Sequence, residues 1–184
     1  VFVFSDGFLA DLERVGLKVL YLKSLSDDFR KVADSIRMWG RITGSLDSAE
    51  ALATQFVDRV ARIEGTMASR GEGPSVFQDE GELWTPGPDT LIGEVFRLLK
   101  LGNIAHDISG YAQLSPEVIV EGNPDIIIAS YGDTISDKPA FANVHAVKNN
   151  RIFVPQSDTL SVAGPRYIDG IEELARWVYP DLFQ

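Results

Sequence analysis

The sequence predicts an α/β protein, and three observations support this fold class. Short apolar runs alternate with stretches in which apolar residues recur at helical spacing, a pattern typical of a mostly parallel sheet covered by helices. Residues 46–69 form one long helical stretch without proline. The 184 residues, 45% of them apolar, are enough for one sizeable core or two small ones. We therefore expect a rigid helix that joins a fragment of one α/β lobe to a complete second lobe.

Residues 1–45 are expected to be a remnant of an N-terminal lobe. Two predicted strands, Val1–Phe4 and Leu17–Leu22, flank a short helix that ends at Gly16, and two strands joined by a helix form a parallel βαβ unit. Two strands do not make a stable sheet, and the chain starts within a strand and without an initial Met. We therefore expect the rest of this lobe, and any targeting segment, to lie upstream.

Two helices are predicted between this remnant and the second lobe. The first is capped by Ser26–Asp28 and carries an apolar stripe as far as Trp39, and Gly40–Gly44 is expected to break it. The long helix follows and, at 1.5 Å per residue, would span roughly 33 Å. Glycines and a proline in residues 71–74 mark its far boundary, so we assign residues 46–70 as the interlobe helix.

Residues 71–184 are predicted to form a three-layer, Rossmann-like lobe with a central, mostly parallel sheet. Buried-type strands alternate with helices, and Pro116 and Pro165 each begin a predicted helix. The expected strands are residues 75–78, 125–130 and 151–155, and the expected helices are residues 90–101, one from 115 and one from 165, with a short segment at 145–147.

Composition excludes several kinds of function. The chain has no cysteine, which rules out disulfides, thiolate metal sites and a cysteine nucleophile. The formal net charge of −10 arises entirely in residues 71–184, because residues 1–70 carry ten basic and ten acidic side chains. An acidic surface repels phosphate backbones, so we expect no nucleic-acid binding, whereas a basic protein partner would be favoured. The alternative is an acidic surface kept for solubility.

No pattern in the sequence predicts catalysis or a metal site. Phosphate-binding, dinucleotide-binding, zinc-protease and serine-hydrolase motifs are absent from the sequence. The two histidines, His106 and His145, lie far apart, and only His106 has an acidic residue beside it, Asp107. We therefore expect no catalytic residues and no metal ligands.

Three loops that follow predicted strands are candidates for a binding site, because ligands of open α/β sheets sit outside the carboxyl ends of the strands. They are residues 79–89, 131–143 and 157–166. Trp84 offers a large flat apolar face, either as a platform for a ligand or as a lid on the local core. Arg166 begins a helix, where a cation opposes the helix dipole, so it either contacts a ligand or forms an ion pair that holds its loop.

Several phrases, in a fixed order, resemble the substrate-binding proteins of ABC importers for iron chelates, haem and cobalamin. They are TLIGEVFRLLKLGNI at 90–104, QLSPEVIVEGNPDIIIAS at 113–130, AVKNNRIFVP at 146–155, Gly164–Arg166, and ELARWVYPDLF at 173–183. The likeness covers essentially the whole chain. In that family two α/β lobes joined by one long helix hold the ligand in the cleft between them. This chain would be the C-terminal lobe, the helix and the end of the N-terminal lobe.

The resemblance implies ligand binding without catalysis. The rigid helix limits closure of the lobes, and the ligand is passed to a permease whose arginines meet one exposed glutamate on each lobe. The position aligned with that glutamate holds Arg97, and Glu94 is the nearest substitute for docking. The cleft residues that the resemblance carries over to this lobe are Trp84, Thr85, Asp158, Thr159, Leu160 and Arg166, with Tyr111 and Tyr131 as further candidates.

The resemblance also implies that the protein has no cofactor and that its ligand is a metal chelate such as a siderophore, haem or a corrinoid. Because the lobe is acidic and only Arg166 is well placed to meet an anion, a neutral or weakly charged corrinoid or hydroxamate chelate fits better than an anionic ferric catecholate. The expected protein partners are the transmembrane subunits of an ABC permease.

The expected location is the periplasm or the extracytoplasmic face of the cell membrane, peripheral to it, with a lipid anchor as one option for the full-length protein. Two alternatives stay open. One is an enzyme or cofactor-assembly protein on a similar two-lobed scaffold, and the other is a sensor or adhesion module without transport. An upstream signal peptide with a lipid-attachable cysteine would favour the importer.

Overall fold

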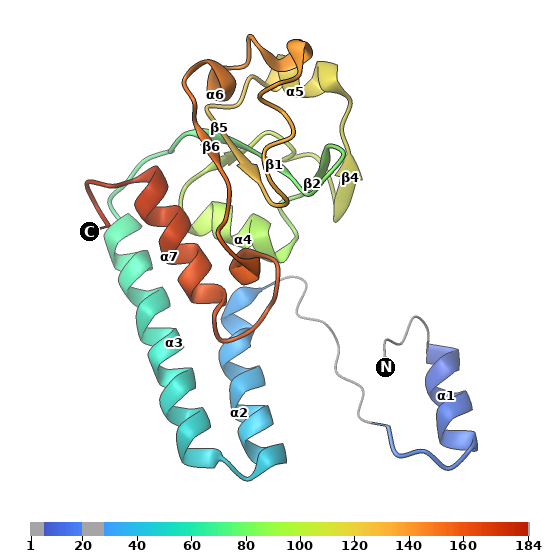
Figure 1. The fold of residues 1–184 in the computed structure, drawn as a ribbon. Coiled ribbons are helices and arrows are strands. Elements are labelled where there is room, and N and C mark those ends of the chain that lie inside the picture. Colours follow the sequence, from blue (N-terminus) through green and yellow to red (C-terminus); the bar gives the residue numbers. More distant parts are fainter. Residues whose placement is uncertain (1–5, 20–27, 184) are drawn as a thin grey trace.

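The fold is built around a four-stranded parallel sheet, seen in the computed structural model, which describes residues 6–19 and 28–183. Helices cover both faces of the sheet (Figure 1). The predicted α/β fold class with a mostly parallel central sheet is confirmed. The strand order is β3 (Gly102–Asn103), β1 (Ser75–Asp79), β5 (Ile126–Ala129) and β6 (Ile152–Phe153). An antiparallel pair, β2 (Trp84–Pro86) and β4 (Tyr111–Gln113), lies beside the sheet.

Alternation along the strands divides the interior into two apolar layers. Val76 and Ile128 belong to the larger cluster, with α4 (Leu91–Leu98) and α7 (Tyr167–Val178). Phe77 and Ile127 point the other way, into a smaller cluster. It packs beneath α5 (Pro116–Gly122), η2 (Pro139–Phe141) and α6 (His145–Lys148). The strands are apolar on both sides because both faces are covered.

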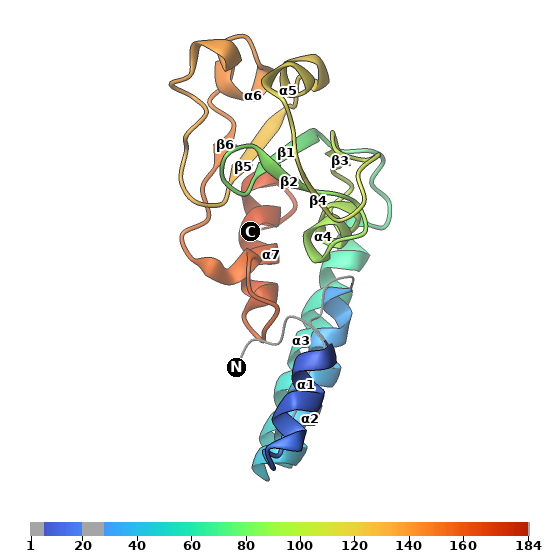
Figure 2. The same cartoon turned by 90° about the vertical axis from the view of Figure 1, so that its right-hand side faces the viewer.

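The long helix α3 runs without interruption from Leu46 to Met67, as predicted. Its C-terminal half packs against α7 and α4, whereas its N-terminal half pairs with α2 (Val32–Thr43) and extends away from the sheet (Figures 1 and 2). From residue 53 onward the buried side chains recur at helical spacing, so one face of the helix packs into the apolar core. They are Ala53, Phe56, Val60, Ile63 and Met67.

The predicted break at Gly40–Gly44 is correct only at Gly44. α2 continues through Gly40 to Thr43, and the turn comes at Gly44, whose φ is +73°. A Cβ atom on Gly40 would collide with the Cβ of Ala49 on α3. Gly40 therefore serves close packing between the two helices, because the missing side chain lets their backbones approach.

The N-terminal part is only partly described. A short helix, α1 (Asp6–Arg14), precedes Gly16 as expected, and a 3₁₀ turn, η1 (Phe29–Lys31), leads into α2. The predicted strand at residues 1–4 lies outside the described residues. Residues 17–19 of the other predicted strand have no strand conformation, and the rest of it lies outside the described part. None of the described helices combines the length and apolarity that crossing a membrane requires.

Candidate ligand site at the carboxyl edge of the sheet

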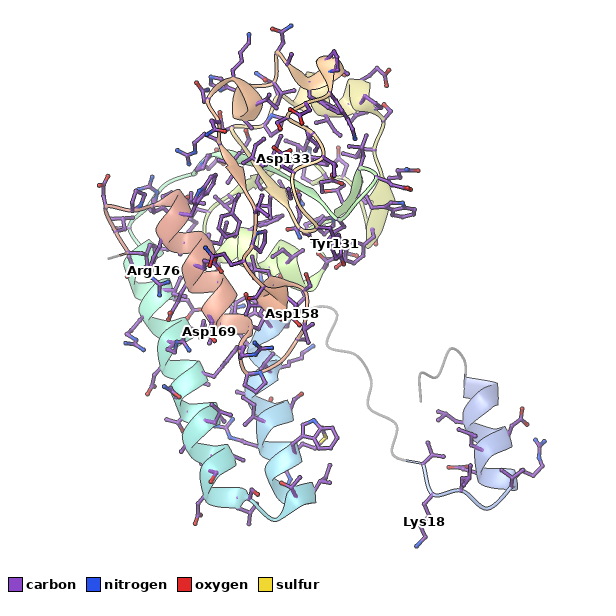
Figure 3. The ribbon with its side chains drawn as sticks, viewed as in Figure 1. Lys18, Tyr131, Asp133, Asp158, Asp169 and Arg176 are labelled. Carbon is purple, nitrogen blue, oxygen red and sulfur yellow. The ribbon has the colours of Figure 1, made fainter. Side chains whose placement is uncertain are left out.

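The segments that follow β1, β5 and β6 leave the sheet at the same edge, because these three strands are parallel. Tyr131, after β5, and Asp158, in the segment after β6, lie on this side of the lobe (Figure 3). This is the edge at which open α/β sheets bind ligands. The three loops singled out in the sequence therefore converge on one side.

The first segment was predicted to be a plain loop, but it contains the strand β2. Antiparallel pairing places Trp84 opposite Gln113 and Pro86 opposite Tyr111, so Trp84 and Tyr111 share one face of the β2–β4 ribbon. Trp84 is 44% exposed and Tyr111 is 54% exposed. Thr85 points to the opposite face and is fully buried. The ribbon thus exposes two aromatic side chains to solvent, whereas the Thr85 side chain is buried on its other face.

A buried carboxylate fixes the turn that leads into this ribbon. Asp79 is 2% exposed and accepts hydrogen bonds from the backbone N–H groups of Gly81 and Leu83, at 3.0 and 2.9 Å. Gly81 has a φ of +92°, which favours glycine, and a Cβ atom on it would lie 3.8 Å from a ring carbon of Tyr131. Asp79 is therefore a structural residue that positions the aromatic ribbon.

Sequence reasoning missed a polar cluster on the neighbouring side chains. Gln78 and Glu80 alternate with Asp79 and face the same side of the sheet as Ser130, which follows β5. The Ser130 hydroxyl donates to Glu80 Oε1 at 3.0 Å, and Gln78 Nε2 donates to Ser130 Oγ at 3.1 Å and also to Glu80 Oε1. The signal in the sequence was a polar run, Gln-Asp-Glu, at the end of a buried strand.

Tyr111 and Tyr167 interact electrostatically with Glu80, and Tyr131 follows Ser130 directly. Tyr167 begins α7 and is fully buried, and burial followed by the fields of Tyr111 and Glu80 raises its pKa. Burial, then Glu80 and Tyr131, likewise raises the pKa of Tyr111. Both phenols therefore remain neutral and able to donate hydrogen bonds at physiological pH. Within the described part of the chain, the Tyr167 hydroxyl and Gln78 Oε1 are buried without a hydrogen-bond partner.

The third segment contains a 3₁₀ turn, η3 (Asp158–Leu160), that divides its candidate residues. Thr159 and Leu160 are buried and pack against Gly170 of α7, where a Cβ atom would lie within 3 Å of both. Asp158 and Arg166 are exposed and form an ion pair at 3.5 Å. Of the two roles considered for Arg166, the structure contains the ion pair that holds the loop.

Glu94 is not a free surface carboxylate. Its side chain is 14% exposed, and it lies 3.5 Å from an Arg30 guanidinium nitrogen and accepts a hydrogen bond from Arg97. Arg30 also pairs with Glu64 of α3 at 2.7 Å, so the group joins η1, α3 and α4. These contacts tie Glu94 into the packing of the helices. Across residues 6–19 and 28–183, no three His, Cys, Asp or Glu side chains are grouped closely enough to hold a metal ion.

Comparison with known proteins agrees with this geometry. The model of a family described as periplasmic binding protein matches residues 3–159. The chain belongs to this family. Two relatives and one solved structure are similar to this binding protein over most of its length. An ABC transporter substrate-binding lipoprotein of Bacillus subtilis, YvrC, is 30% identical over 188 residues, covering 98% of this chain and 60% of the relative.

The other two similar proteins bear names that point to different ligands. A cobalamin-binding protein of Halobacterium salinarum is 29% identical over 149 residues, covering 74% of this chain and 40% of its own length. A possible iron-binding periplasmic solute-binding protein of Staphylococcus epidermidis superposes with a TM-score of 0.76 at 27% identity, covering 93% of this chain and 70% of that one. This binding protein therefore spans about 40 to 60% of the length of its curated relatives.

Proposed function

We propose that this binding protein captures a metal chelate, namely an iron chelate, haem or a corrinoid, for an ABC importer. The ligand would lie between the carboxyl edge described above and a second lobe, to which residues 1–45 belong, with residues 46–70 as the connecting helix. The protein would act at the extracytoplasmic face of the membrane and deliver its ligand to the permease. The observation that supports this most is the exposed aromatic group at the edge, Trp84, Tyr111 and Tyr131.

The chemistry of the edge favours a large, flat ligand without strong negative charge. Three exposed aromatic side chains offer apolar contact area to a macrocycle or a compact chelate. Glu80 is acidic, and Arg166, a cation at this edge, already lies beside Asp158. An anionic ferric catecholate would meet repulsion there, so we propose a corrinoid or a neutral hydroxamate chelate as the ligand.

The test is to titrate the full natural chain separately with cyanocobalamin, a neutral ferric trihydroxamate, haemin and a ferric catecholate. Binding is monitored by tryptophan fluorescence. We expect micromolar or tighter binding of at least one of the first three, and weak binding of the catecholate. Preferential binding of the catecholate would overturn the proposed ligand class. A protein that binds none of the four would overturn the proposed function.

A further inference from the structure

Glu80 holds a fixed position at the centre of the candidate site. It follows β1 directly, its backbone N–H donates to the Trp84 carbonyl at 2.7 Å, and its carboxylate accepts hydrogen bonds from Ser130 and Gln78. These bonds come from a neighbouring strand end and from its own strand. Glu80 is only half-buried, so its carboxylate is oriented by the sheet and still reachable from the edge.

The immediate surroundings of this carboxylate do not neutralise it. Its described partners are an amide and a hydroxyl, not a cation. Gln78, itself 1% exposed, supports this carboxylate from within the lobe through its Nε2. Arg166, the cation of the third loop, is paired with Asp158. An oriented carboxylate therefore lies at the edge without a cation among its described partners, and such an acceptor favours N–H donors or a positive charge.

We propose that Glu80 determines specificity by accepting a hydrogen bond from an N–H group of the ligand, so that the site selects chelates with primary carboxamide or ammonium groups at their periphery over chelates with carboxylates there. This inference rests on the proposed function and narrows its ligand class. The exposed rings of Tyr111 and Tyr131 would flank the recognised group, and Gln78 and Ser130 would hold the carboxylate in place as positioning residues.

A carboxylate on the ligand would be rejected for a physical reason. It would bring a second negative charge next to Glu80, where no described cation compensates it, and it would lack the proton that Glu80 accepts. A carboxamide of nearly the same shape supplies that proton. Replacing the charged acceptor by glutamine keeps the size of the side chain and removes this discrimination, because an amide can both donate and accept.

The experiment uses two matched pairs of probes with the full natural chain. One pair is cyanocobalamin and its derivative in which one peripheral amide is hydrolysed to a carboxylate. The other pair is a linear ferric trihydroxamate with a terminal ammonium and the same chelate succinylated at that amine. Dissociation constants are measured by isothermal titration for the native protein, for Glu80→Gln, and for Glu82→Gln as the control. Glu82 is exposed on the same turn, so this control makes the same charge change nearby.

We expect the native protein to prefer the N–H-bearing member of the pair that it binds by about tenfold or more, the size of a charge-assisted hydrogen bond. E80Q should reduce this preference to within about threefold, while E82Q keeps it. Equal affinity of the native protein for both members, or an unchanged preference in E80Q, would overturn the inference and leave the proposed function standing. Failure of the native protein to bind any of the four probes would overturn the inference, and the proposed function would then stand only if the protein binds haemin. Should E80Q not fold, Glu80→Asp withdraws the carboxylate by one methylene and must also lower the preference.

Discussion

Arg59 of α3 donates two parallel hydrogen bonds to the carboxylate of Glu172 on α7. Arg59 Nε and Nη2 each lie 2.8 Å from one of the two carboxylate oxygens, and Nη2 also lies 2.6 Å from Asp169 Oδ1. The side chains of Arg59 and Glu172 are each about one-fifth exposed. Because this planar pairing is directional, it fixes the rotation of the long helix against α7, the helix that carries Tyr167 and packs against η3.

We predict that Arg59→Met lowers the free energy of unfolding by about 1–2 kcal/mol, a value reduced for the partial exposure of the pair. The hydrogen bonds from Arg59 hold the pKa of Glu172 below its ordinary value. This stabilisation is therefore complete above the ordinary pKa of 4.5 and is lost as the pH falls through the lower, folded-state pKa. Urea unfolding at several pH values checks this.

The matched control is Arg41→Met, since Arg41 is an exposed arginine on the neighbouring helix α2. It should change stability by less than about 0.5 kcal/mol. The difference in the free energy of unfolding between the native protein and R59M should be largest near neutral pH and should become smaller in acid. A gap that stays constant down to pH 3 would show that the carboxylate of Glu172 does not carry the effect.

Gly40 and Gly65, the glycines within the two helices of the hairpin, should respond in opposite ways to replacement by alanine. Gly40→Ala should destabilise the protein by about 1–3 kcal/mol, because the new methyl group would force α2 away from Ala49 on α3. Gly65→Ala should stabilise it by about 0.5–1 kcal/mol, because Gly65 is in a helix and a Cβ atom there meets no atom within 4 Å. Thermal melts of the native protein and both variants, monitored by circular dichroism, measure these changes in stability. Equal effects of the same sign would contradict the packing role of Gly40.

The sequence predicted those features of the fold that are encoded locally. An unbroken helical stripe in residues 46–67 and an apolar run at 126–129 leave few alternatives, and both were predicted correctly. The role of Gly40 was predicted wrongly because it depends on Ala49, across the turn of the hairpin. The strands β2, β3 and β4 were missed since each has only two or three residues and exists through its pairing partner.

Glu94 provides a prediction that separates packing from permease docking. Its carboxylate already meets Arg30 and Arg97, so Glu94→Gln should lower the free energy of unfolding by about 1–2 kcal/mol. Arg97→Gln should cost less than about 0.5 kcal/mol, because that side chain is largely exposed. At a temperature where E94Q is folded, stimulation of permease ATPase activity should stay within about twofold of the native value. Loss of stimulation by folded E94Q would instead identify Glu94 as a docking residue.

The candidate site was predicted at the level of the sheet edge but not of individual side chains. Parallel strands fix which loops converge, so the loops containing Trp84, Tyr131 and Asp158 were identified from topology alone. Which way a residue points within a loop depends on pairing and packing. Thr85, one of the predicted cleft residues, is buried for that reason, and so are Thr159 and Leu160 of η3. Glu80 was missed because its contacts come from another strand end.

Trp84 provides the most direct test of the site. If its exposed ring is a platform for the ligand, Trp84→Ala should weaken binding of cyanocobalamin or a ferric trihydroxamate by about tenfold to a hundredfold, as for aromatic residues that dominate interfaces. Trp84→Phe should retain most of the affinity, because a flat apolar ring remains. The control is Trp177→Phe, since Trp177 packs against Phe153 on β6 and not on the β2–β4 ribbon. Ligand should quench the fluorescence of the native protein and of W177F, and much less that of W84F. If W84F were quenched as strongly as the native protein, the ligand would bind away from the aromatic ribbon, and the carboxyl edge would not be the site.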